Sequence, residues 1–218
     1  MVDYQVTIDR ENGRLIVKGS FAPDSFPIEI PLDNPDRKEF IDLFLHKADI
    51  EKGIDFLRCI SIDKDITVNE GLFVAGLNNC IKCFKFSASR KKLEKDSVFS
   101  DNEKMLQQFI DFETIRDKHF DHDENGMLQA IAFLLIRDNP EHIFGGPPSV
   151  VWNRVMFDYY LAGQRLQETM QFIHIHLSKQ IDEVGKRIEN YYNEYSYETL
   201  SNYKAAEIKL ASATSERK

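Results

Sequence analysis

The stretch YYLAGQRLQETMQFIHIHLSKQIDEVGKRIENY, residues 159–191, carries the most regular apolar pattern in the chain. Its apolar residues recur at steps of three or four positions: Tyr159, Ala162, Leu166, Met170, Ile173, Leu177, Ile181, Val184, Ile188 and Tyr191. This spacing places them on one face of an α-helix. A stripe of that length needs another surface to cover it. The pattern therefore predicts one long helix that lies on a helical bundle or pairs with a second chain.

Three more helices are predicted upstream of this one. The first opens at Asn34-Pro35-Asp36, where an Asn cap precedes a Pro at the first helical position, and its apolar stripe extends to Leu57. The second runs from about Thr67 to Leu93 on helical apolar spacing. The third opens at the capping box Ser100–Glu103 and ends near the turn-forming residues 121–126. We therefore expect a mainly α fold with a helical bundle over residues 34–203.

Two short β-hairpins are predicted beside the helices. The first covers residues 1–33, where Tyr4, Val6 and Ile8 alternate with polar residues. A turn signal at residues 11–13 and then a second apolar run follow. This pattern predicts a small hairpin flap. The apolar run 130–136 fits a buried strand slightly better than a helix, and residues 150–152 are its candidate partner strand. Residues 204–218 lose apolar density and are predicted to form a flexible tail.

Composition narrows the class of protein. The chain of 218 residues is 42% hydrophobic, and its 28 basic side chains against 36 acidic ones leave a net charge of −8. This acidic balance argues against a protein that coats nucleic acid with its whole surface, but it allows a local basic groove. No apolar run approaches the ~18 residues of a membrane span, and the first residues do not resemble a secretory signal. Three cysteines, an odd number, indicate a reducing compartment, so we expect a cytoplasmic protein without a membrane partner.

One local segment is strongly basic. Six cations lie between positions 82 and 95, opposed only by Glu94: Lys82, Lys85, Arg90, Lys91, Lys92 and Lys95. Such a run would provide a few contacts to the phosphates of an anionic partner. It is equally compatible with a solvated helix C-terminus whose cations complement the helix dipole. The sequence leaves both interpretations open.

The densest polar constellation lies at residues 116–126. Arg116 and His122 are the pair of interest, because a guanidinium grips phosphate oxygens and an imidazole transfers protons near neutral pH. Those two groups suffice to cleave RNA by transesterification without a metal ion. On an ideal helix they lie about 120° apart, so the helix must end or bend between them, or a second protomer must complete the site. The alternative is an exposed polar helix terminus.

The motif Arg116-Asp117-Lys118-His119-Phe120-Asp121-His122, preceded by the helical segment 78–84, resembles the HEPN (higher eukaryotes and prokaryotes nucleotide-binding) superfamily. The resemblance covers roughly residues 35–195 and is strongest to bacterial helical proteins, some linked to abortive infection. It implies an up-and-down helical bundle, usually a homodimer whose two motifs meet at the interface. Many members are metal-independent endoribonucleases of toxin–antitoxin or phage-defence systems, and others are inactive.

By matching position, the resemblance implies that Arg116 is the phosphate ligand, His122 the acid and base, and Asp117 the polar residue that orients them. We expect the nucleic acid to be held by nearby basic side chains, namely Lys118, His119, Lys85, Arg90, Lys91 and Lys92. The expected partners are RNA, a second copy of the chain and an antitoxin protein, with no cofactor. Asp121 stands where relatives often have Ala, and it brings acidic neighbours close to His122. This departure favours the alternative, a non-catalytic HEPN-like dimeric interaction or nucleic-acid-binding protein.

Two further patterns imitate metal sites. Residues 121–126 fit the start of a calcium loop, but Ala132 occupies the twelfth position, where a bidentate Glu is required. Cys80 and Cys83 have CxxC spacing within an apolar helical pattern, which is typical of buried core thiols. We therefore predict no metal site.

Overall fold

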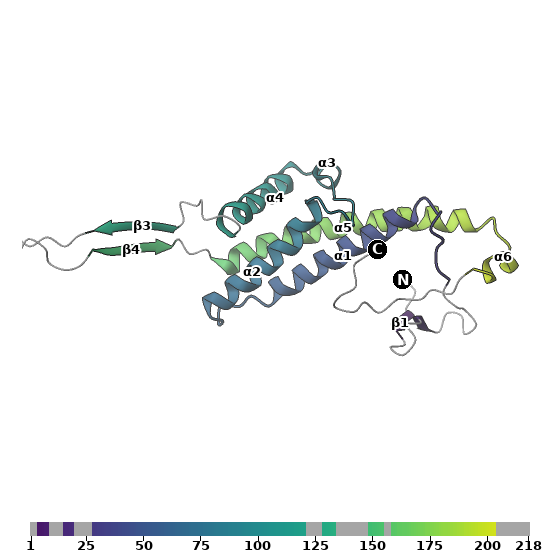
Figure 1. The fold of residues 1–218 in the computed structure, drawn as a ribbon, viewed down its shortest axis with the longest axis horizontal. Coiled ribbons are helices and arrows are strands. Elements are labelled where there is room, and N and C mark those ends of the chain that lie inside the picture. Colours follow the sequence, from purple (N-terminus) through teal and green to yellow (C-terminus); the bar gives the residue numbers. More distant parts are fainter. Residues whose placement is uncertain are drawn as a thin grey trace, which may run out of the picture. The chain divides into compact units, whose positions relative to one another are not determined.

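The computed structural model describes residues 4–8, 15–19, 28–120, 128–133, 148–154 and 158–203. Within them the chain is mainly helical (Figure 1), which confirms the predicted fold class at that level. The helical elements are α1 (Arg37–Arg58), α2 (Ile66–Ile81), the 3-10 turn η1 (Lys82–Phe84), α3 (Lys95–Val98), α4 (Glu103–Ile115), the π-turn η2 (Arg116–Phe120), α5 (Tyr159–Tyr192) and α6 (Tyr197–Ser201). The strands are β1 (Tyr4–Ile8), β2 (Leu15–Gly19), β3 (Leu128–Phe133) and β4 (Ser149–Arg154).

Two predicted features lie outside the described residues: the end of the third helix at 121–126 and the tail at 204–218. Among the helices that are described, none combines the length and the apolar character needed to cross a membrane.

The chain divides into two compact units. Unit 1 comprises residues 1–45, 88–91 and 178–218, and unit 2 comprises residues 46–87 and 92–177. The beginning of α1 and the end of α5 therefore belong to unit 1, and the rest of both helices belongs to unit 2. The candidate site described below lies within unit 2.

Unit 1 contains the start of α1. Asn34 Oδ1 accepts a hydrogen bond from the backbone N–H of Asp36 over 3.0 Å, and the helix begins directly afterwards. The Arg187 guanidinium pairs with Asp36 at 2.9 Å and with Glu39 at 2.8 Å. The two carboxylates also complement the positive end of the helix dipole. The cap predicted at the start of the first helix is confirmed.

The long final helix is confirmed as α5. Most of the predicted apolar stripe is buried: Tyr159, Leu166, Met170, Ile173, Leu177, Ile181, Val184 and Ile188. Steps of three and four keep these side chains on one face as the helix advances, so a single stripe supplies core residues along its whole length.

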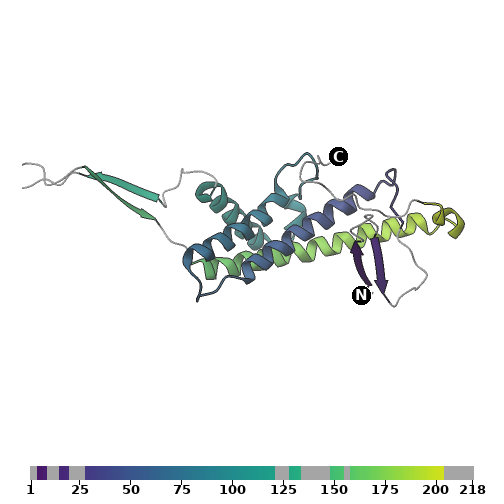
Figure 2. The ribbon, with the colours of Figure 1, turned by 60° about the horizontal axis from the view of Figure 1, so that its bottom comes forward.

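Within unit 2, α2 lies alongside the second part of α1, as Figures 1 and 2 both show. The two helices approach closely because each has a glycine at the contact. A Cβ atom placed on Gly76 would lie 2.7 Å from Cδ2 of Leu57, and one on Gly53 would lie 3.2 Å from the Gly76 carbonyl oxygen. Phe73 of α2 is fully buried beside this contact, with its ring centroid 5.8 Å from that of Tyr159.

The prediction of the second helix is wrong for its C-terminal half. Helix α2 ends after 16 residues, η1 adds one tight turn, and the chain is then non-helical until α3. The backbone N–H of Leu93 donates to the Cys83 carbonyl over 2.8 Å, so the chain turns back on itself. The Phe84 ring packs on Phe109 at 4.4 Å between centroids, whereas Phe86 is 89% exposed. Tertiary packing of Phe84 and Leu93 thus overrides the helical spacing.

The described residues form two antiparallel strand pairs. At the N-terminal end β1 pairs with β2, with Tyr4 opposite Gly19 and Ile8 opposite Leu15. In the second hairpin β3 pairs with β4, with Leu128 opposite Arg154. The predicted second short hairpin is confirmed.

The prediction that the first strand of this second hairpin is buried is wrong. Ile131 is 65% exposed and its neighbours Ala132 and Phe133 are exposed as well, as is Val150 on β4. Successive strand residues point to opposite faces, so both faces of the ribbon are open at this end. An apolar run is buried only where a further element packs on it, and sequence spacing does not reveal that packing. Residues 134–136 of the predicted strand lie outside the described residues.

Gly76→Ala should destabilise the protein by about 1–3 kcal/mol, because the added methyl group overlaps the buried Leu57 side chain. The measurement is the free energy of unfolding in urea, followed by helical circular dichroism. Gly71→Ala is the matched control on the same helix, since nothing lies within 4 Å of its Cβ position. That substitution should stabilise the protein by about 0.4–1 kcal/mol. Equal effects of the two substitutions would contradict the close helix contact.

Candidate functional site

The predicted Arg–His motif begins at a local change of helix geometry. Arg116 is the first residue of η2, the π-turn that continues α4. A π-turn closes hydrogen bonds from i to i+5, which changes the angular spacing of the side chains that follow. His122 itself lies outside the described residues, as do the side chain of His119 and the acidic neighbours at 121–124.

Two side chains orient the Arg116 guanidinium. Its Nε donates to Asn78 Oδ1 over 3.2 Å, and its Nη1 donates to Asp117 Oδ1 over 2.9 Å. Asn78 comes from the last turn of α2, so the guanidinium connects α2 with the π-turn. A quarter of the Arg116 side chain is exposed, which leaves it accessible to a ligand from solution.

The network continues through two lysines. Lys85 Nζ lies 3.0 Å from Glu113 Oε1 and 3.4 Å from Asp117 Oδ2, and Lys95 pairs with the other oxygen of Glu113. We call the connected set the Arg116 cluster: Asn78, Lys85, Lys95, Glu113, Arg116 and Asp117. The described members of the cluster comprise three cations and two carboxylates, a difference of one positive charge. Such a surface can attract an anion, although its own carboxylates compete for the cations.

The ion pairs keep two of these groups charged at neutral pH. Partial burial acts to lower the pKa of Lys85, but the hydrogen bonds and charges of Glu113 and Asp117 outweigh it and raise the pKa. Burial likewise acts to raise the pKa of Glu113, but the two lysines outweigh it and lower the pKa. Lys85 is therefore a cation and Glu113 an anion over the physiological pH range.

Of the predicted site residues, Arg116, Asp117 and Lys85 come together in this cluster. Lys118 lies on η2 with an exposed side chain. Lys92 lies 3.4 Å from Glu94. Arg90 and Lys91 belong to unit 1, where the Lys91 backbone N–H donates to Asp42 Oδ2 over 3.1 Å.

The basic run at 82–95 is therefore not one helix face, which corrects the helical interpretation of that segment. Four of its lysines have carboxylate partners: Lys82 with Asp49, Lys85 with Glu113 and Asp117, Lys92 with Glu94, and Lys95 with Glu113. The positive charge that the sequence concentrates here is largely compensated by Glu94 within the run and by Asp49, Glu113 and Asp117 from other segments.

Sequence reasoning did not assign a site role to three cluster members: Asn78, Lys95 and Glu113. Glu113 had a usable signal, because it lies three residues before Arg116 and four before Asp117, one helical turn away. Asn78 and Lys95 come from other elements, and only packing brings them to the π-turn.

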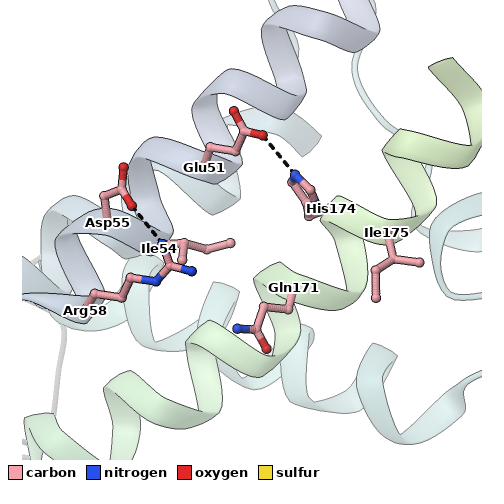
Figure 3. Close-up of a pocket in the computed structure, with 7 residues that line it drawn as sticks. All are labelled: Glu51, Ile54, Asp55, Arg58, Gln171, His174 and Ile175. Carbon is pink, nitrogen blue, oxygen red and sulfur yellow. Dashed lines mark hydrogen bonds and ion pairs between the residues drawn. The ribbon is translucent and has the colours of Figure 1, made fainter. Parts of the chain in front are cut away.

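A second polar surface lies between α1 and α5 within unit 2, where a pocket of about 540 Å³ opens. Figure 3 shows a hydrogen bond and an ion pair at its edge: His174 Nε2 lies 2.9 Å from Glu51 Oε1, and Arg58 Nη1 lies 3.2 Å from Asp55 Oδ1. Gln171, Ile54 and Ile175 complete the lining. Paired polar groups beside an apolar floor could bind a small polar ligand, but they are separate from the predicted motif.

The described residues contain no group of three or more His, Cys, Asp or Glu side chains that could hold a metal ion. Cys80 and Cys83 are buried thiols that are not joined in a disulfide, which confirms the interpretation of the CxxC pair as buried thiols. Burial, and then the neighbouring Cys83, raise the pKa of the Cys80 thiol well above its usual value. The protonated thiol is a poor nucleophile and a poor metal ligand.

Comparisons of the chain with protein-family models, curated proteins and solved structures find no match.

Glu113→Gln should lower the free energy of unfolding at pH 7 by about 1 kcal/mol, because it removes the carboxylate that pairs with two lysines. The folded-state pKa of Glu113 is lowered from its usual 4.5, so its contribution is present above that pH and is lost as the pH falls. The difference from wild type should therefore shrink below about pH 4. Urea unfolding at pH 7 and at low pH measures both effects.

The matched control is Glu168→Gln, which changes an exposed carboxylate on α5 of the same unit. It should change stability by less than about 0.5 kcal/mol at either pH. A Glu113→Gln protein as stable as wild type at pH 7 would contradict the role of these ion pairs.

Proposed function

We propose that the chain is a HEPN-like, metal-independent endoribonuclease of a toxin or phage-defence type, built as an up-and-down helical bundle. One observation carries the proposal. The Arg116 guanidinium, oriented from two sides by Asn78 and Asp117, remains accessible within a cluster of net positive charge. A guanidinium held in this way can bind two oxygens of one phosphate.

In the proposed reaction His122 removes the proton of the ribose 2′-hydroxyl, whose oxygen attacks the adjacent phosphorus atom. Arg116 stabilises the negative charge that develops on the phosphorane, and Lys85 adds a second cation nearby. The bond from phosphorus to the 5′-oxygen breaks, and the leaving oxygen receives a proton from the protonated imidazole. The products are a 2′,3′-cyclic phosphate and a 5′-hydroxyl end.

The partners in this proposal are RNA, a second copy of the chain that completes the site, and an antitoxin protein in the cytoplasm. The RNA strand would run along Lys118 and His119, with Lys85 and Lys92 of the same unit as further phosphate contacts.

A second function is favoured by a different observation. Glu113 and Asp117 compensate most of the positive charge of Lys85, Lys95 and Arg116 within the protein itself. This arrangement supports a non-catalytic HEPN-like protein that keeps the bundle and the dimer but uses the cluster for structure or for binding alone.

Wild-type protein incubated with RNA in excess EDTA should produce fragments with 2′,3′-cyclic phosphate ends. Arg116→Ala and His122→Ala should each slow cleavage roughly 10²- to 10⁴-fold, because each removes a group that acts in the transition state. Gel electrophoresis of end-labelled RNA, with analysis of the fragment ends, measures rate and chemistry together.

The matched controls are Arg58→Ala and His174→Ala, which remove an arginine and a histidine from polar contacts away from the cluster. Both should cleave at the wild-type rate. Intact RNA with wild-type protein, or equal cleavage by Arg116→Ala and wild type, would exclude the nuclease and leave the binding function.

A further inference from the structure

The Asp117 carboxylate occupies a position that an anionic ligand would also prefer. Its Oδ1 accepts a hydrogen bond from Arg116 over 2.9 Å, and its Oδ2 lies 3.4 Å from the Lys85 ammonium. One carboxylate thus bridges a guanidinium and an ammonium group through its two oxygens. Two non-bridging oxygens of a phosphodiester would meet the same two cations in the same way.

We propose that Asp117 is an internal substitute for the phosphate of the ligand, which occupies Arg116 and Lys85 in the free protein and is displaced when RNA binds. The inference rests on the proposed function only for the identity of the ligand as RNA. It concerns regulation of binding, because it assigns to Asp117 a competing role in addition to its orienting role.

The geometry makes displacement feasible. Asp117 and Lys85 are each about two-fifths exposed, at 41% and 42%, and ion pairs in contact with water contribute little. Each cation also has a second anchor that does not depend on Asp117: Asn78 holds Arg116, and Glu113 holds Lys85. When the carboxylate leaves, these two contacts still hold the cations in position.

The competing carboxylate also explains why a surface with three cations need not bind every anion. A ligand must interact with these cations more favourably than Asp117 does. This condition disfavours small anions of single charge and favours a chain of phosphates. The like charge of Asp117 lowers affinity for all anionic ligands, and the cumulative contacts of a nucleic acid strand compensate for that loss.

The test measures binding without cleavage. An RNA oligonucleotide whose 2′-hydroxyls are all methylated lacks the attacking group, and its dissociation constant is measured by fluorescence anisotropy in EDTA at low salt. Asp117→Asn, which keeps the size of the side chain and removes its charge, should bind the oligonucleotide roughly two- to fivefold more tightly than wild type. Asp117→Ala should also bind more tightly, and Arg116→Ala should bind more weakly.

The matched control is Asp111→Asn on the exposed side of α4, where the carboxylate accepts a hydrogen bond from Gln107 over 2.9 Å. It removes the same charge from the same segment without touching the Arg116 cluster, and its affinity should equal that of wild type. Thermal unfolding of each variant confirms that the proteins compared are folded.

Equal tightening by Asp117→Asn and Asp111→Asn would show an effect of net charge and would overturn the inference. It would also be overturned if Asp117→Asn bound no more tightly than wild type, or if neither protein bound measurably. Weaker binding by Arg116→Ala without tightening by Asp117→Asn would reject the internal competitor while retaining the RNA site. Tighter binding by Asp117→Asn, together with wild-type protein that leaves unmodified RNA intact, would support the competitor and reject the nuclease.

Discussion

The candidate site depends on the close approach of α1 and α2. Gly53 and Gly76 carry no side chains of their own at this contact, so the Leu57 side chain of α1 lies directly against the α2 backbone at Gly76. At the end of α2 the Lys82 ammonium pairs with Asp49 of α1 at 2.7 Å, which fixes the final turn. Asn78 lies in that turn, and it is the residue that holds Arg116 from outside the π-turn. A shift of α2 along α1 would therefore move one of the two anchors of the guanidinium.

Charge compensation is the second property of this site. Carboxylates and cations alternate along the network from Lys95 through Glu113, Lys85 and Asp117 to Arg116. Each group has an opposite charge beside it, so the cluster does not present a uniformly positive surface. An anionic ligand gains from Arg116 and Lys85 only what it offers beyond the carboxylates already there. The cluster therefore has only a small excess of positive charge, although the chain as a whole has a net charge of −8.

Local sequence patterns predicted a helix correctly where its caps and its apolar spacing lie within the same segment. The cap at Asn34 and the apolar stripe of α5 appear where spacing and side-chain chemistry place them, whereas α4 is capped by Asn102 and not by Ser100, the first residue of the predicted capping box. The same reasoning failed after Ile81, because Phe84 and Leu93 gain more from burial against other segments than from continuing a helix. It also failed to distinguish a buried strand from an exposed one at β3, since burial depends on a neighbour that the local sequence does not specify.

For the site, the sequence by itself determined the residue types: adjacent Arg116 and Asp117 at a helix end, and a nearby concentration of lysines. Their spacing is a property of one segment, so a single sequence is enough to reveal it. Only the tertiary structure decided that Asn78, Glu113 and Lys85 meet at that helix end, and that most of the lysine charge is compensated there. The physical reason is that ion pairs form between segments far apart in the chain, and their partners are chosen by how the helices pack.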